Sequence, residues 1–368
     1  MLLQCHMVTG KAGRGHLLAD DITIYTPEWS KMMSIRHRSS FMLPFFTLLV
    51  LLTLLLAACG QAVSGTVNSS TPTSLKKVSI GLGYIPDIQF APFYVAKTQG
   101  YYRNVGLDVT FHHGIVNDLI GSMVLGRDNL VFASGDEELA ARSKGLKVID
   151  VATIFQKYPV SLIVPADSSI HTLADLKGHT IGEPGPYGAT YIGLLALLYQ
   201  AHLTPNDVHI KSIGFTQVAA LIGRHVDAVM GYSNNEPLQL RKQGFAVRTF
   251  DVSDYQPLVS NGIITTEDTF HSQPQLVQSF VQATLKGLRD VIANPSLAVQ
   301  ISKSYIPGMD PDRAMSVLQA TIPIYRGNGR LGYNDSVTWQ SMERFLVAQN
   351  IIPSGQDFSQ AYTNLNGL

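Results

Sequence analysis

The sequence predicts an α/β protein in which residues 76–368 form two lobes of similar design. Short apolar segments of strand length alternate with segments of helical periodicity, first from Val78 onward and again from Val160. This alternation is typical of a mostly parallel sheet covered by helices on both faces. One short element also occurs twice: a Gly-Arg pair, a turn, a strand and then acidic residues, at 126–137 and at 223–236. The repeat favours two lobes over one large sheet.

The first half of the pattern predicts four strands and three helices. Gly100 is placed to end the first helix, and Ser134 or Asp136 is placed to cap the third. The predicted strands cover residues 78–82, 107–111, 129–133 and 148–155, and the predicted helices cover residues 90–99, 116–125 and 136–144.

The second half restarts the pattern and ends in a helical tail. Turn-forming residues at 165–169 follow its first strand. Prolines stand at the start of three tail helices, where their missing N–H is tolerated. The predicted strands cover 160–164, 179–183, 208–213 and 226–230; the predicted helices cover 190–201, 218–222, 274–292, 295–305, 311–322 and 336–349.

The segment ahead of the lobes is predicted to direct export. An apolar run from Phe41 to Leu56 follows basic residues and leads into Leu-Ala-Ala-Cys, which ends at Cys59. This ending resembles the bacterial lipobox, so we expect a lipoprotein signal peptide at 32–58 and lipidation of Cys59. A plain transmembrane anchor is the alternative, because the run is nearly long enough to span a bilayer. Residues 59–75, rich in Ser, Thr and Gly, are predicted to be a flexible tether. Residues 1–31 are expected to be a spurious or disordered leader.

The charge balance and the cysteine count exclude several classes of function. Lys and Arg number 27, as do Asp and Glu, so the formal charge is zero and nucleic-acid binding has no electrostatic support. The cysteines are Cys5 and Cys59, both ahead of the lobes, which leaves the lobes without a disulfide or a thiol nucleophile. Adjacent His112 and His113 point to opposite sides of a strand and make a poor metal pair. We therefore expect no metal and no cofactor.

Three segments together carry a resemblance to a known family. Residues 77–110 read KVSIGLGYIPDIQFAPFYVAKTQGYYRNVGLDVT, residues 173–185 read LADLKGHTIGEPG, and residues 219–237 read AALIGRHVDAVMGYSNNEP. In this order they resemble the thiamine-pyrimidine family of periplasmic-binding-like proteins. The resemblance implies a bilobal fold of type II, in which two strands cross between the lobes. The implied boundaries are 76–160 for the first part of lobe 1, 161–258 for lobe 2, and 259–368 for the return to lobe 1 and the C-terminal helices.

The resemblance also implies a function. Relatives include importer receptors for formylated aminopyrimidine, importer receptors for riboflavin, and fungal enzymes that make the thiamine pyrimidine. Tyr84 and Phe90 stand where the pyrimidine receptors carry Trp and His, and the added apolar area suits a larger flat ring such as isoalloxazine. We therefore expect a monomeric extracytoplasmic lipoprotein at the cell membrane that captures riboflavin for an ABC permease. A receptor for the pyrimidine is the alternative.

The enzyme class can be compared residue by residue. The fungal enzymes carry a cofactor-bearing lysine just after a strand, a histidine four residues on, and a cysteine-rich motif. Here these positions fall on Ala133 and Glu137, and no cysteine remains. Alanine cannot form a Schiff base, so we expect no catalysis. A ligand-sensing or scaffold lipoprotein that feeds no transporter is a third class.

Candidate ligand contacts in the first lobe lie in loops that follow strands, because ligands of open α/β folds bind beyond the carboxyl ends of strands. Aromatic rings can stack on a ligand and amides can bond to its edges; the alternative is that Tyr84 and Phe90 only fill the core. The acids at 136–137 can accept from polar ligand atoms, or they serve only as a helix cap. The candidates are Tyr84, Asp87, Gln89, Phe90, Ser134, Asp136, Glu137 and Tyr158, the last at the first crossover.

Candidate contacts in the second lobe lie in a Gly-rich loop and in the segment after the strand at 226–230. A loop that leads into a helix can cradle an anion, although no Lys accompanies it here. Asn261 lies near the second crossover. The candidates are Tyr187, Gly188, Thr190, Tyr232, Asn234, Glu236 and Asn261. We expect the two lobes to close over the ligand and bury both faces of its ring.

Overall fold

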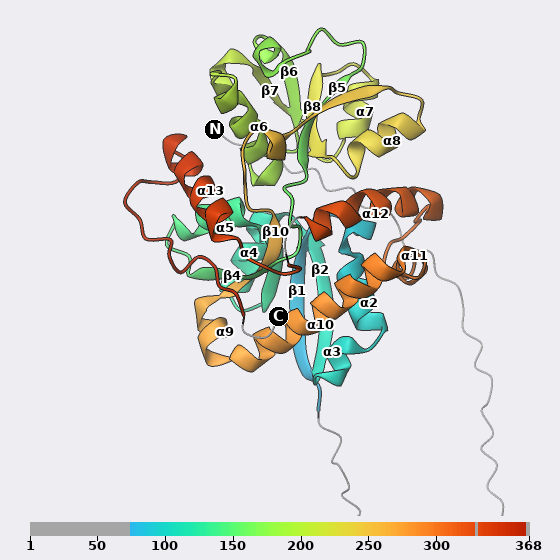
Figure 1. Cartoon of the computed structure of the whole chain (residues 1–368), viewed down its shortest axis with the longest axis vertical. Coiled ribbons are helices and arrows are strands. Elements are labelled where there is room, and N and C mark those ends of the chain that lie inside the picture. Colours follow the sequence, from blue (N-terminus) through green and yellow to red (C-terminus); the bar gives the residue numbers. More distant parts are fainter. Residues whose placement is uncertain (1–73, 328–329, 366–368) are drawn as a thin grey trace, which may run out of the picture. The chain divides into compact units, whose positions relative to one another are not determined.

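The computed structural model describes residues 74–327 and 330–365. These residues form two five-stranded sheets, each flanked by helices (Figure 1). The predicted leader, the signal peptide and the lipidation residue Cys59 lie outside the described residues, as does the tether apart from its last two residues. None of the helices in the described ranges is both long enough and apolar enough to cross a membrane.

The first sheet contains β1 (Lys76–Gly83), β2 (Leu107–Gly114), β3 (Leu130–Ser134), β4 (Val148–Thr153) and β10 (Asn261–Thr266), in the order β2-β1-β3-β10-β4. Strand β1 pairs in parallel with β2 and β3, whereas β10 is antiparallel to β3 and β4. Strand β4 therefore runs in the same direction as β1, β2 and β3, so the sheet is mostly parallel, as predicted, and β10 runs against the other four strands. The sheet is mixed because β10 enters at the carboxyl ends of its neighbours, where Asn261 pairs with Ser134.

The second sheet contains β5 (Val160–Pro165), β6 (Thr180–Glu183), β7 (His209–Ser212), β8 (Ala228–Tyr232) and β9 (Val247–Asp251), in the order β7-β6-β8-β5-β9. Strand β5 is antiparallel to β8 and begins opposite Tyr232, the last residue of β8. The two connections between the sheets also contact each other, since the backbone N–H groups of Ile154 and Phe155 donate to the Asn261 carbonyl, both at 2.9 Å. Both connections thus lie at the edge where an α/β fold binds its ligand.

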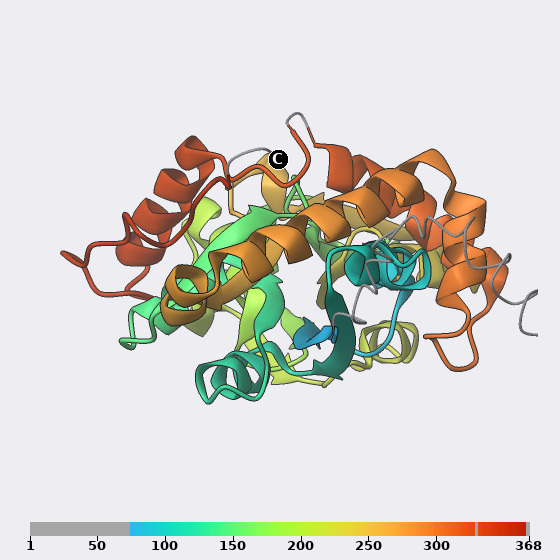
Figure 2. The same cartoon turned by 90° about the horizontal axis from the view of Figure 1, so that it is seen from below.

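The helices around the first sheet enclose the largest apolar core. In that core the Tyr102 ring stacks on Phe280, with centroids 5.0 Å apart. Helix α10 (Pro274–Ala293) runs obliquely across this half of the molecule and packs on α2 (Figure 2). The other helices here are α2 (Ala91–Thr98), α3 (Tyr101–Asn104), α4 (Val116–Val124), α5 (Gly135–Arg142), α9 (Glu267–Ser272), α11 (Pro295–Ser302) and α12 (Pro311–Arg326).

The second sheet is flanked by α6 (Gly188–Gln200), α7 (Gln217–Ile222) and α8 (Glu236–Lys242). The last helix, α13 (Ser336–Ala348), contacts α5 but buries Trp339, Met342 and Phe345 in the core cluster of the second sheet. The Trp339 ring stacks on Tyr362, with centroids 4.8 Å apart. The helical tail therefore serves both cores: α10 to α12 cover the first, and α13 helps to complete the second.

Two carboxyl groups are buried together near β4 and α5. Asp150 and Glu138 are both fully buried. Asp150 Oδ1 accepts hydrogen bonds from Asn334 Nδ2 at 3.0 Å and from the Ala152 N–H at 2.8 Å. Burial raises the pKa of Asp150 to about 7, against these hydrogen bonds, which lower it. Burial, and then the negative charge of Asp150, hold the pKa of Glu138 well above its usual range.

The close packing of α10 on α2 depends on Gly287. A Cβ at this position would lie 2.3 Å from the Pro92 carbonyl oxygen and 2.9 Å from the Ala96 Cβ. We expect Gly287→Ala to lower the free energy of unfolding by about 1–3 kcal/mol, because the two helices must move apart. Urea unfolding followed by circular dichroism would measure the change.

Gly121→Ala is the matched control, because Gly121 lies inside α4 and a Cβ there would meet nothing within 4 Å. This variant should gain up to about 1 kcal/mol of helix propensity. Equal effects of the two substitutions would contradict the steric explanation.

Candidate ligand-binding site

A pocket lies between the two sheets, at their carboxyl edges. It encloses about 760 Å³, part of which is open to solvent. Both lobes contribute to its wall, so a ligand inside would contact both. Its lining comprises Gly83, Tyr84, Gln89, Phe90, Gly114, Ile115, Val116, Phe132, Glu137, Pro184, Tyr187, Gly188, Ala189, Thr190, Phe215, Gln217, Tyr232, Asn235, Glu236 and Asn261.

Ten of the fifteen candidate contacts line this pocket, and five do not. The ten are Tyr84, Gln89, Phe90, Glu137, Tyr187, Gly188, Thr190, Tyr232, Glu236 and Asn261. The five outside the lining are Asp87, Ser134, Asp136, Tyr158 and Asn234. All five are buried residues whose side chains hydrogen-bond to other parts of the protein, so they act behind the wall.

Tyr84 lies where the two lobes meet. Its φ of 146° is unusual for a residue with a side chain, and such strain occurs often at binding sites. A backbone bond of 3.0 Å from its N–H to the Gly114 carbonyl holds the loop in place. The ring meets Phe215 of the second lobe edge-on, with centroids 5.0 Å apart, and its hydroxyl bonds to the Asn235 side chain. Tyr84 thus connects the lobes and also forms part of the pocket wall.

Phe90 packs in the apolar core and also lines the pocket, so it fills the core without being excluded from the site. It is 1% exposed, and its ring packs edge-on against His113 and Phe132 at centroid distances of 5.4 and 5.9 Å. Gln89 beside it is buried and lines the pocket. Asp87 caps this turn instead, since its Oδ1 accepts from the Gln89 N–H at 3.1 Å.

The start of α5 forms a capping box in which Glu137 also reaches the pocket. Glu137 Oε2 accepts from the Ser134 N–H at 3.0 Å and from the Ser134 hydroxyl at 2.8 Å. The backbone of Ala189, at the start of α6 in the second lobe, also bonds to this carboxyl group. Burial raises the pKa of Glu137, while the bonds from Ser134 and Ala189 oppose the rise. Both readings of this residue therefore apply: it caps its own helix and lines the pocket.

Asp136 and Tyr158 lie behind the wall. The Tyr158 hydroxyl donates to the Ala189 carbonyl at 2.8 Å and lies 3.4 Å from Asp136 Oδ2. Burial, and then the charge of Glu137, raise the pKa of Asp136 to about 7. Tyr158 stands between β4 and β5, so its bond to Ala189 ties the first crossover to the start of α6.

The second-lobe wall is built around the end of β8. Glu236 Oε2 accepts from the Tyr232 N–H at 2.7 Å, and the Tyr232 hydroxyl lies 3.4 Å from Asn261 Oδ1. Burial raises the pKa of Glu236 to about 7, opposed by the Tyr232 N–H. Asn234 turns away and donates to Thr321 of α12 at 2.7 Å. This segment therefore provides an aromatic ring and a carboxyl group to the pocket and a tie to the other lobe behind it.

Several wall residues follow strands that the sequence predicts, yet they were not among the candidates. Ile115 and Val116 come directly after β2, and Phe215 and Gln217 come shortly after β7. The signal for them was the rule used for the other loops, that ligands lie beyond strand ends. Asn235 sits between two candidates, and Phe132 points into the pocket from within β3.

The pocket wall combines aromatic rings, side-chain amides and two carboxyl groups. Among the described residues, those that line it include no Lys, Arg or His. Residues 74–327 and 330–365 also hold no group of three His, Cys, Asp or Glu side chains that could bind a metal ion. Such a wall can stack on a flat ring and hydrogen-bond to its edges, and it lacks a positive side chain to hold an anion.

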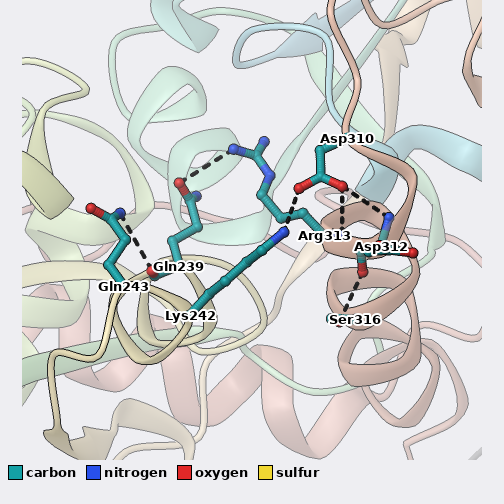
Figure 3. A network of polar contacts seen from close by, with 7 residues as sticks. All are labelled: Gln239, Lys242, Gln243, Asp310, Asp312, Arg313 and Ser316. Atoms are coloured by element: carbon teal, nitrogen blue, oxygen red, sulfur yellow. Dashed lines mark hydrogen bonds and ion pairs between the residues drawn. The ribbon is translucent and has the colours of Figure 1, made fainter.

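A polar network joins α8 of the second lobe to α12 of the first (Figure 3). Lys242, in the last turn of α8, pairs with Asp310, which caps α12. Arg313 of α12 donates to Gln239 of α8 at 3.4 Å and lies 3.9 Å from Asp87 Oδ2. Because Lys242 and Asp310 are about half exposed, this pair contributes little to stability and weakens as salt is added.

The sequence matches the protein family described as NMT1/THI5 like over residues 87–298. A riboflavin-binding protein, RibY, from Chloroflexus aurantiacus is 36% identical over 86% of this chain and 96% of its own length. A formylaminopyrimidine-binding protein from Halalkalibacterium halodurans is 26% identical over 82% of this chain and 93% of its own. A 4-amino-5-hydroxymethyl-2-methylpyrimidine phosphate synthase from Legionella pneumophila is 24% identical, over 79% and 93%.

A solved structure shows the same fold. The periplasmic aliphatic sulphonate-binding protein SsuA from Escherichia coli superposes with a TM-score of 0.65 at 16% identity, covering 78% of this chain and 97% of its own. The predicted bilobal fold of the periplasmic binding proteins is thereby confirmed. With a family match over more than half its length and a relative above 30% identity, this chain belongs to the NMT1/THI5-like family.

Proposed function

We propose that this protein is an extracytoplasmic solute-binding protein that captures riboflavin for an ABC importer. The observation that carries the proposal is the pocket wall, which combines the rings of Tyr84, Phe215 and Tyr232 with side-chain amides. An isoalloxazine ring offers two large flat faces to such rings, and its carbonyl and imide edge suits amide and carboxyl partners. The riboflavin-binding relative from Chloroflexus aurantiacus supports the same ligand.

The location and partners follow from the proposed role. The apolar run that precedes Cys59 supports export and lipid attachment, which would hold the protein beside its permease and raise its effective concentration there. The ties between the lobes at Tyr84, Glu137 and the α8–α12 network support a closed form that a permease can recognise. Mass spectrometry of the mature N-terminus tests the anchor: an unmodified, uncleaved chain would reject it.

We propose further that the protein makes and breaks no bond. Ala133, at the position of the cofactor-bearing lysine of the fungal enzymes, is fully buried in β3 within a small apolar cluster. Glu137, at the position of their histidine, already accepts bonds from Ser134 and Ala189. These contacts support binding rather than catalysis, because neither residue can act as an amine or an imidazole.

Titration followed by flavin fluorescence tests the ligand. Riboflavin is expected to show saturable quenching with one site per chain, because stacking on Tyr or Phe rings in a desolvated pocket quenches its emission. Isothermal titration with the formylated aminopyrimidine is the companion experiment, since the relative from Halalkalibacterium halodurans favours that ligand as the second candidate. Absence of both heat and quenching with riboflavin would reject the proposal, and saturable heat with the pyrimidine alone would replace it with the alternative.

A further inference from the structure

Helix α6 begins at the pocket and needs a partner for its first N–H groups. The helix runs from Gly188 to Gln200, and within the described residues the side chain of its N-cap, Tyr187, makes no capping bond. The first N–H groups of any helix lack partners inside the helix, and together with the helix dipole they attract anions. In a pocket for an anionic solute, the ligand itself would accept hydrogen bonds from these N–H groups.

Here a carboxyl group of the other lobe lies at the start of α6 instead of a ligand. The Ala189 backbone bonds to Glu137, and a Cβ built on Gly188 would lie 3.2 Å from Glu137 Oε1. The second carboxyl oxygen is held by the Ser134 N–H and hydroxyl, at 3.0 and 2.8 Å. Glu137 is only 7% exposed and lines the pocket, so it is a fixed wall group and not a mobile surface charge.

The other residues of the pocket wall also disfavour an anionic ligand. Glu236 supplies a second carboxyl group from the opposite lobe, and among the described lining residues there is no cationic side chain. Arg313 lies by Asp87 and Gln239 and is not among the residues that line the pocket. A phosphate group brought into the pocket would therefore meet carboxyl groups and find the α6 start already filled.

We infer that Glu137 determines specificity by occupying the anion position of α6, so that the pocket accepts the uncharged ring alcohol and rejects its phosphate ester. The inference rests on the proposed function and makes it narrower: the ligand is riboflavin and not riboflavin 5′-phosphate. Discrimination comes from a repulsive element built into the wall, which is a common way for a site to exclude a close analogue.

Parallel titrations of riboflavin and riboflavin 5′-phosphate at pH 8, where the phosphate is doubly charged, test the inference. For the natural protein we expect the phosphate ester to bind about 100-fold more weakly, or weaker still. Glu137→Gln keeps the shape and one oxygen acceptor, and it should narrow the ratio of the two dissociation constants about 10-fold. Asp136→Asn is the matched control, since it removes the neighbouring carboxyl group outside the pocket lining and should leave the ratio unchanged.

The possible results separate this inference from the proposed function. If the natural protein binds neither flavin, the proposed function fails; if it binds both equally, the inference alone fails. Equal changes of the ratio of dissociation constants in Glu137→Gln and Asp136→Asn would also overturn the inference. The ratio would then depend on the net charge of the region and not on the group at the start of α6. A readout without flavin is the melting temperature in inorganic sulfate: stabilisation of Glu137→Ala but not of the natural protein supports the inference, and equal shifts contradict it.

Discussion

Replacing both Tyr84 and Phe215 with Ala is expected to weaken riboflavin binding by about 100-fold. The two rings meet edge-on with their centroids 5.0 Å apart, one from each lobe, and both line the pocket. Each ring is expected to contribute about 1–1.5 kcal/mol through stacking and burial, so each single substitution should cost about 10-fold. Fluorescence titration of the singles and the double variant measures the loss. The double variant also reports whether the rings act independently.

Two control variants distinguish the loss of a ring contact with the ligand from an unspecific loss of structure. Tyr255→Ala removes an aromatic ring that is 41% exposed and does not line the pocket, so binding should not change. Tyr84→Phe keeps the ring and removes only the hydroxyl that bonds to Asn235, so its loss should be smaller than that of Tyr84→Ala. If the double variant binds riboflavin as tightly as the natural protein, the aromatic wall is not where the ring lies.

The unfolding free energy is expected to fall between about pH 4 and pH 7, and Asp150→Asn should remove part of that fall. The pKa of Asp150 is about 7 in the folded protein and near 3.8 ordinarily. Between these values the folded protein keeps a proton that the unfolded chain has released, so stability decreases as pH rises. A shift of this size corresponds to roughly 4–5 kcal/mol, because each pKa unit is worth about 1.4 kcal/mol. At pH 8 the Asn variant should therefore be the more stable protein.

Urea unfolding at pH 5 and pH 8 measures the effect. Asp108→Asn is the control, because Asp108 is an exposed carboxylate on β2, the strand at the opposite edge of the same sheet. An amide at position 150 can still accept from Asn334 and Ala152, as Asp150 does now. The buried carboxyl groups of Asp136 and Glu236 also have pKa values of about 7. The free energy of unfolding should therefore still decrease with rising pH in both variants. Equal destabilisation of Asp150→Asn at both pH values would contradict the assignment.

Most strands and long helices could be predicted from the sequence because their apolar spacing is regular. The helix predicted over 274–292 is α10, and the strand predicted over 160–164 is β5 within one residue. The elements that were missed are short or lack a clear period: α3 has four residues, and α8 and α9 are largely polar. Strands β9 and β10 were also missed, and β10 is the antiparallel member of the first sheet. Its place and direction depend on where the chain returns from the second sheet, which local spacing does not reveal.

The candidate site was predictable where a loop follows a strand within a recognised motif. Tyr84, Glu137, Tyr232 and Glu236 were found in this way and line the pocket. Asp87 and Asn234 were drawn in by the same motifs, but a turn cap and a bond to Thr321 hold them behind the wall. Phe215 was missed because its neighbours carry no motif. Its place opposite Tyr84 depends on how the two lobes meet, and no local pattern encodes that.

The route of the chain has a consequence for domain engineering. The segment from Val160 to Asp251 is, in genetic terms, an insertion into the first lobe, and its entry and exit meet at the Asn261 carbonyl. A lobe cut out at these points would nevertheless be incomplete, since Trp339, Met342 and Phe345 of α13 are part of its core. Transplanting it into another scaffold would leave apolar surface bare unless α13 were grafted along with it.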